Sequence, residues 1–325
     1  MAKRSQVLPL ALLIILLAGF GIAFTNRDII LDRLKASFYT PSPEMAEIKN
    51  SLNLTERGTL IFNATNPVLD SRDQFNFDCE SNDPEIAVYG CYTGDKIYVY
   101  NINDPELPGF RESTAAHELL HAVWHRLSSI ERKRLIPLLE TVYSDNKEMF
   151  EETLSAYDES ERIDELYVRS ATQVKNLPSE LESHFSEIFK NQDEIVDFYN
   201  SYITPFEELN KKIESLGSEL ESKKTELEKL TAEYESRSKT FNKDVEEFNS
   251  CANTPGCFKS DYEFNTRRNA LVSVSSELDA LYLKLSEEIE EYNKIVDEYN
   301  ANILHNKTLQ NLVNSNSKPE TLNAN

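Results

Sequence analysis

The residues best suited to chemistry stand in the run His117-Glu118-Leu119-Leu120-His121. Residues four apart lie on one face of a helix, so both imidazoles can reach the same ion. Imidazole is a usual ligand of Zn²⁺, and a glutamate between two such ligands can orient and deprotonate a water molecule held by the ion. The pattern therefore predicts a zinc site at His117 and His121, with Glu118 as the catalytic base.

The neighbours of this run are small or apolar, which predicts a buried helix over Arg111–Leu127 with Ser113 or Thr114 as its N-cap. The alternative is a pair of surface histidines on an amphipathic helix. It fits poorly, because Leu119, Leu120 and the residues after His121 leave little polar surface.

The run resembles the motif of the zincin metallopeptidases. The metzincin version is excluded, because it needs a glycine and a third histidine where Trp124 and Leu127 stand. The gluzincin version remains, with a glutamate on a later helix as the third ligand. His125 lies about 12 Å along the helix from His117, so we expect it to support a ligand or to lie at the surface.

Glu165 is the predicted third ligand, 44 residues after His121 on a predicted amphipathic helix. The region 75–189 resembles a largely uncharacterised group of membrane-anchored bacterial metallopeptidases, in which an equivalent acidic residue opens a helix segment. The resembling pieces are Phe75-Asn76-Phe77-Asp78-Cys79, Gly90-Cys91-Tyr92, Thr114-Ala115-Ala116-His117-Glu118 and Leu177-Pro178-Ser179-Glu180-Leu181-Glu182.

This sequence departs from the gluzincin pattern after Glu165. Gluzincins often place an aspartate three or four residues further on, where Val168 and Arg169 stand here. Glu182 is therefore the second candidate for the third ligand. Tyr167 and His184 are candidates for stabilising the charge that develops on the substrate carbonyl.

The sequence pattern around this site predicts an α+β, zincin-like domain over 51–200. This domain contains a small antiparallel sheet and the motif helix, which position the site. Thr59–Phe62 is a strand candidate, and the runs 86–92 and 97–102 read as a hairpin around Thr93-Gly94-Asp95. We expect a substrate peptide to add along a sheet edge such as Ile97–Ile102. Helices are predicted from Ser113 onward.

A long antiparallel coiled-coil hairpin is predicted over 205–312. Apolar residues alternate at spacings of three and four on both sides of Cys251-Ala252-Asn253-Thr254-Pro255-Gly256-Cys257. Folding about Thr254 places Leu230 opposite Leu278. The alternative, two helices that pair with other chains, is weaker because the closed turn favours the intramolecular partner. The tail 313–325 is polar and predicted to be disordered.

The four cysteines fall into two local pairs, Cys79 with Cys91 and Cys251 with Cys257, which predicts two disulfide bonds. Neither pair has the close spacing of a Cys₄ zinc site.

The N-terminus predicts a membrane anchor. Lys3 and Arg4 precede 18 uncharged positions from Val7 to Phe24, nearly enough to cross a bilayer. Basic residues before the span place residues 1–6 in the cytoplasm, 7–24 in the membrane and the body outside, after a linker helix over 25–50. A cleavable signal peptide is the alternative, with the body secreted. The net charge of −22 argues against binding nucleic acid.

Two functions follow as expectations. The first is a membrane-anchored, extracytoplasmic zinc metallopeptidase that acts on a peptide or protein substrate. The second is an envelope interaction protein whose hairpin binds a partner and whose zinc domain is structural or inactive.

Overall fold

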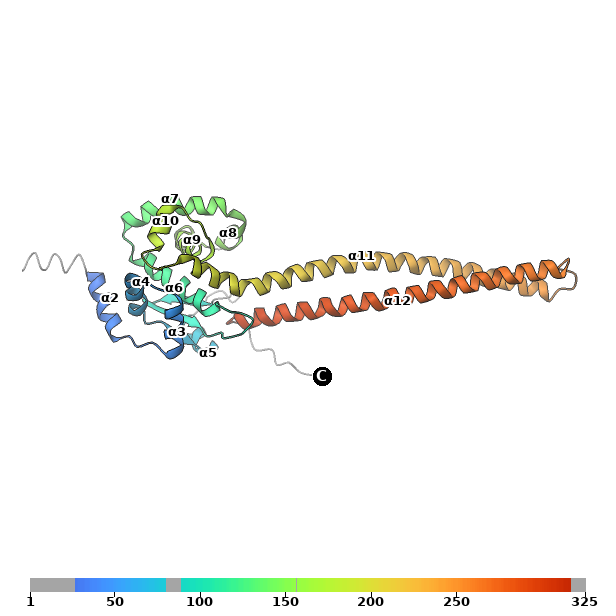
Figure 1. Ribbon diagram of the computed structural model, residues 1–325, viewed down its shortest axis with the longest axis horizontal. Helices are drawn as coiled ribbons and strands as arrows, with labels where there is room; N and C mark the ends of the chain where they lie inside the picture. The colour runs from blue at the N-terminus through green and yellow to red at the C-terminus, as the bar shows by residue number, and fades with distance from the viewer. Residues whose placement is uncertain (1–26, 80–88, 156, 317–325) are drawn as a thin grey trace, which may run out of the picture. The chain divides into compact units, whose positions relative to one another are not determined.

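The computed structural model describes residues 27–79, 89–155 and 157–316. The chain divides into two compact units, one formed by residues 1–205 and 310–325 and the other by residues 206–309. Figure 1 labels their helices. The predicted cytoplasmic segment 1–6, the predicted anchor 7–24 and residues 317–325 of the predicted disordered tail lie outside the described residues.

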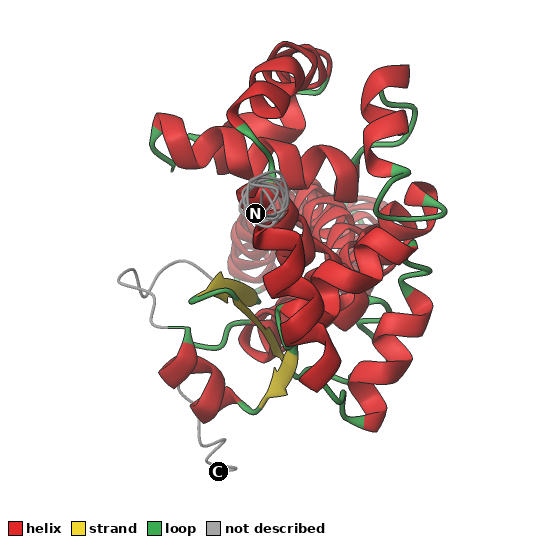
Figure 2. Cartoon of the chain, turned by 90° about the vertical axis from the view of Figure 1, so that its left-hand side faces the viewer, coloured by secondary structure: helices red, strands yellow, loops and turns green. Residues whose placement is uncertain are grey.

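The first unit is mostly helical, with one small sheet (Figure 2). Its elements are α2 (Arg27–Phe38), α3 (Pro43–Ser51), α4 (Glu56–Ala64), β1 (Val68–Asp70), α5 (Arg72–Asp78), β2 (Gly90–Thr93), β3 (Lys96–Tyr100), α6 (Phe110–Arg126), α7 (Ser129–Asp145), α8 (Lys147–Leu154), α9 (Glu159–Gln173) and α10 (Ser179–Phe185). The expectation of a helical chain after Ser113 is confirmed, and so is the presence of a small sheet.

The strand predicted at Thr59–Phe62 is wrong, because these residues lie in α4. Thr55 caps this helix by accepting a hydrogen bond from the backbone N–H of Gly58. Ile61 and Phe62 are then buried in the core. A short apolar run of this kind suits a buried helix as well as a strand, so its periodicity could not decide between them.

The sheet has the order β1-β3-β2 and is mixed rather than antiparallel. β1 pairs parallel with β3, and β2 pairs antiparallel with β3. The predicted hairpin is confirmed for its described part. Gly94 and Asp95 form its two-residue turn with positive φ angles of 58° and 62°, as a primed turn requires. β3 is the central strand, so the prediction that Ile97–Ile102 offers an edge is wrong, and β2 takes that place.

The motif helix α6 lies in the core of the first unit, where it packs against α9. Leu119, Leu120 and Val123 of α6 are fully buried, and so are Leu166 and Tyr167 of α9. α6 begins one residue earlier than predicted, with Gly109 as its N-cap. Ser113 and Thr114 are buried inside the helix, so neither is the cap.

Arg126, at the end of α6, joins three elements. It forms a two-point ion pair with Asp32 of α2, at 2.9 and 3.0 Å. It also contacts Asp95 of the β-turn at 2.7 Å and donates a hydrogen bond to the Tyr92 hydroxyl at 3.1 Å. One guanidinium therefore holds α2, the β2–β3 hairpin and α6 together.

The second unit is an antiparallel pair of helix arms taken from α11 (Gln192–Ala252) and α12 (Asp261–Val313) (Figure 1). α11 starts well before the predicted boundary at Pro205, which lies inside the helix. Both predicted disulfides are present, Cys79–Cys91 in the first unit and Cys251–Cys257 at the tip of the hairpin.

The register of the hairpin differs from the prediction. Folding about Thr254 would place Val274 opposite Tyr234, but the ring of Tyr234 contacts that of Tyr282, with centroids 5.8 Å apart. The displacement is about one heptad, so seam residues still meet seam residues. Lys223 interrupts the seam and is paired across it with Glu288 at 2.8 Å.

The prediction of a single-pass membrane protein is corrected. Among the described residues, no helix combines the length and the apolar character that crossing a membrane requires. The predicted linker helix over 25–50 is, in its described part, the two helices α2 and α3 separated by Tyr39–Ser42.

Candidate metal centre

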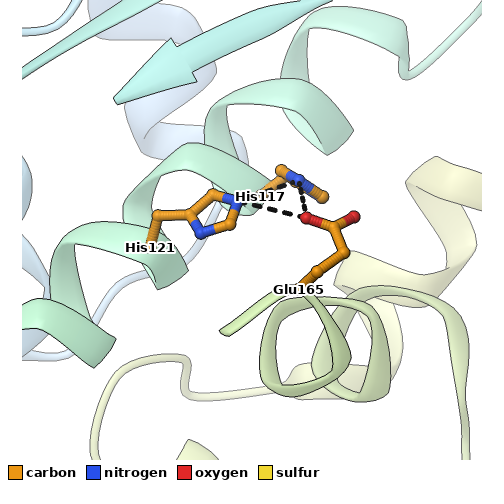
Figure 3. A group of neighbouring side chains, drawn as sticks. All are labelled: His117, His121 and Glu165. Atoms are coloured by element: carbon orange, nitrogen blue, oxygen red, sulfur yellow. Dashed lines mark hydrogen bonds and ion pairs between the residues drawn. The ribbon is translucent and has the colours of Figure 1, made fainter. Parts of the chain in front are cut away.

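Three side chains from α6 and α9 point toward one another: His117, His121 and Glu165 (Figure 3). The Nε2 atoms of the two histidines are 3.2 Å apart. The Oε2 atom of Glu165 lies 3.6 Å from Nε2 of His117 and 3.5 Å from Nε2 of His121. The structure thus brings together the two predicted ligands of the motif and the predicted third ligand.

The spacing of these atoms fits a tetrahedral zinc site. Zn²⁺ binds nitrogen and carboxylate oxygen at about 2.0–2.1 Å, which places tetrahedral ligand atoms about 3.3 Å apart. The three measured separations scatter closely around that value. Two imidazoles and one carboxylate are a donor set that Zn²⁺ accepts, and three protein ligands leave a fourth position for water or substrate.

The helix that carries Glu165 fixes the direction of its carboxylate. Glu165 is only 3 % exposed, and its second oxygen, Oε1, accepts a hydrogen bond from Nε of Arg169 at 2.5 Å. Burial alone would raise the pKa of Glu165, but the facing histidines and Arg169 hold the pKa well below its ordinary value. The carboxylate is therefore charged and aimed at the two imidazoles.

Asp164 orients His121 from the other side of the ring. Its Oδ1 atom lies 2.9 Å from Nδ1 of His121, and its Oδ2 atom lies 3.2 Å from Nε2 of His125. A carboxylate on Nδ1 fixes the tautomer that leaves Nε2 able to bind a metal. No aspartate follows Glu165 within four residues, and the carboxylate that contacts His121 comes from Asp164, directly before Glu165. His125 supports Asp164, in line with the expectation of a supporting or surface role.

We expect Asp164→Asn to weaken zinc binding by about 10–100-fold while the fold is kept, because the imidazole would lose its charged partner. Competition with a chromophoric chelator measures the zinc affinity, and circular dichroism checks the fold. Asp145→Asn is the control, because Asp145 is exposed at the end of α7 and lines neither part of the space around the triad. An unchanged affinity in Asp164→Asn would show that Asp164 does not orient the ligand.

Glu118 lies beside the triad and is only 5 % exposed. Burial raises the pKa of Glu118, and the charges of His117 and His121 oppose that rise. β2 passes very close to it: a Cβ atom on Gly90 would lie 2.7 Å from Oε1 of Glu118 and 2.6 Å from the methyl group of Thr114. Only glycine allows the strand to approach α6 so closely.

A cleft runs past the triad on both sides. The larger part has a volume of about 900 Å³, and we call it the acidic half. It is lined by the triad and Glu118 together with Asp78, Cys79, Gly90, Cys91, Tyr92, Thr93, Trp124, His125, Arg132, Tyr157, Glu161 and Asp164.

The smaller part has a volume of about 430 Å³, and we call it the tyrosine-lined half. It is lined by His117, Glu118 and Glu165 together with Tyr89, Gly90, Ser113, Thr114, Thr153, Tyr157, Arg169, Thr172, Gln173, Tyr199, Tyr202 and Ile203. The centre therefore lies in an accessible groove large enough for a peptide.

The other predicted site residues lie elsewhere. Tyr167 is fully buried, and its hydroxyl lies 2.9 Å from Nε2 of His184, so the two form a core pair that lines neither half of the cleft. Glu182 is exposed on α10 and lines neither half. Tyr157 was missed, although it lines both halves and its hydroxyl interacts with Arg169. It follows α8 in a short connection without a periodic pattern, so nothing in the sequence singled it out.

Comparisons with protein-family models, with curated proteins and with solved structures gave no match for this chain.

Proposed function

We propose that this protein is a zinc-dependent metallopeptidase. The observation that carries the proposal is the convergence of three ligand atoms from His117, His121 and Glu165 at tetrahedral spacing, with Glu118 beside them in an open cleft. Bound Zn²⁺ would supply Lewis-acid chemistry, polarising the substrate carbonyl and lowering the pKa of water.

Glu118 is the general acid–base. Its carboxylate takes a proton from the attacking water and then delivers it to the nitrogen of the departing amine, so one group serves both steps. Glu118 lines both halves of the cleft, so its carboxylate can be reached from either side of the centre.

Tyr157 is placed to donate a hydrogen bond to the oxygen that becomes negatively charged during attack. It lines both halves of the cleft beside the triad, and Arg169 holds its hydroxyl. A donor fixed in advance at such a position stabilises the transition state more than the ground state.

β2 provides a place for the substrate backbone. In its antiparallel pairing with β3, backbone groups point alternately toward the partner and away from it. Residues 89, 91 and 93 have the backbone groups that point toward β3. This follows because the hairpin turns at Gly94-Asp95 and the N–H of Tyr100 donates to the carbonyl of Tyr89. The backbone N–H and C=O groups of Gly90 and Tyr92 then point away from β3, along the cleft, where an extended peptide can pair with them.

Chelation tests the proposal. We expect the purified full-length protein to hold about one zinc ion per chain and to cleave a denatured protein substrate. The chelator 1,10-phenanthroline should abolish cleavage, and added Zn²⁺ should restore it. The isomer 1,7-phenanthroline, which cannot chelate, is the matched control. A chain without zinc, or cleavage that survives chelation, would refute the proposal.

A further inference from the structure

The two halves of the cleft differ in charge. In the acidic half, Asp78 and Glu161 add negative charge beyond the centre itself, and the carboxylate of Asp164 faces His121 and His125. Among the lining residues that the structure describes, Arg132 is the one lysine or arginine; its Nε donates to the Trp124 carbonyl at 3.1 Å, and its guanidinium lies over the Trp124 ring. The three acidic side chains outnumber this one cation, so the acidic half favours a positively charged side chain.

The tyrosine-lined half is neutral apart from the centre. Of its described lining residues, Glu118, Glu165 and Arg169 alone are charged, and the last two are paired with each other. Its aromatic rings form a connected group around the buried Phe110, which contacts Tyr89 at 5.4 Å and Tyr202 at 5.5 Å between centroids. Such a surface favours an aromatic or large apolar side chain.

The direction of a bound peptide follows from β2 and α6. Gly90 lies against Thr114 and Glu118, and the ring of Tyr92 lies 5.5 Å from that of His125. β2 and α6 therefore run the same way along the cleft, from the tyrosine-lined half to the acidic half. Antiparallel pairing is the more stable kind per residue. A peptide antiparallel to β2 thus enters the acidic half with its N-terminal part.

We propose that the substrates carry lysine or arginine on the N-terminal side of the cleaved bond and an aromatic residue on the C-terminal side. The basic side chain occupies the acidic half near Glu161, and the aromatic side chain occupies the tyrosine-lined half. This inference rests on the proposed peptidase function and adds the substrate class to it.

The test compares four peptides that differ only in two central residues: Arg-Phe, Phe-Arg, Ala-Phe and Arg-Ala. Binding is measured by fluorescence anisotropy on zinc-loaded Glu118→Gln protein, so the preference can be read without turnover. Cleavage sites are mapped by mass spectrometry with the unaltered protein. We expect Arg-Phe to bind best, to be cleaved fastest, and to be cut between the two residues.

The variant Glu161→Gln checks the acidic half. We expect it to weaken binding of Arg-Phe by about fivefold, since an exposed ion pair contributes about 1 kcal/mol at most, and to leave Ala-Phe unchanged. Glu159→Gln removes the same charge from the same helix outside the cleft, and it should change neither peptide.

The outcomes separate the two proposals. A preference for Phe-Arg, or equal binding of all four peptides, would overturn the substrate assignment. If Arg-Phe binds best but the zinc-loaded protein cleaves no peptide, the peptidase function fails while the charge preference of the cleft stands.

Discussion

Replacing Glu118 by glutamine is expected to lower kcat/KM for peptide hydrolysis by about 10³-fold, within the range that general acid–base groups contribute. Glutamine has nearly the same shape and cannot accept the proton of the attacking water. Glu118 lies beside the two histidines without being one of the three converging ligands, so zinc should remain at one ion per chain. Steady-state kinetics and metal analysis on the same preparation measure both quantities.

Glu112→Gln is the matched control, because Glu112 lies in the first turn of α6 and lines neither half of the cleft. It should keep full activity. Hydrolysis by Glu118→Gln at the unaltered rate would remove Glu118 from the chemistry. Loss of zinc in this variant would instead show that Glu118 holds the ion or its surroundings.

Replacing Glu165 by glutamine is expected to weaken zinc binding by at least about 100-fold, more than the loss of a supporting residue. The neutral amide is a poor zinc ligand, and it also leaves the partly buried Arg169 without its charged partner. Zinc affinity is measured by chelator competition, and the shift in Tm on adding zinc gives a second reading.

Glu182→Gln separates the two candidate glutamates, because Glu182 is exposed on α10 and away from the cleft. It should bind zinc as tightly as the unaltered protein. A weakened affinity in Glu182→Gln together with a normal one in Glu165→Gln would reverse the assignment of the third ligand.

The parts of the site that the sequence predicted well are those that depend on local spacing. His117 and His121 face the same way because one helical turn separates them. The cysteine pairs were predicted because each joins residues close in sequence. Glu165 was named through a resemblance, since spacing alone does not show which of many later glutamates returns to α6.

The features that were missed depend on packing between segments distant in sequence. Asp164 orients His121 only because α9 lies against α6. The residue pattern of neither helix shows that the two helices pack against each other. β3 became the central strand because β1, a three-residue strand without a clear pattern of its own, pairs with it.

The predicted register of the coiled coil was wrong for a different reason. Heptads repeat every seven residues, so a shift of one heptad gives another set of seam contacts of similar quality. The polar interruptions distinguish the registers better: Asn306, 8 % exposed, donates to Asn210 at 2.6 Å, and Lys223 meets Glu288. Such polar contacts across a seam oppose sliding of one helix along the other.

The contacts of Arg126 have a consequence for local unfolding. Because one side chain binds Asp32, Asp95 and the Tyr92 hydroxyl, separating any one partner weakens the hold on the others. α2 and the strand that borders the cleft should therefore open as one cooperative unit rather than fray separately. Disturbing α2, at the beginning of the described chain, would then loosen β2 at the wall of the cleft.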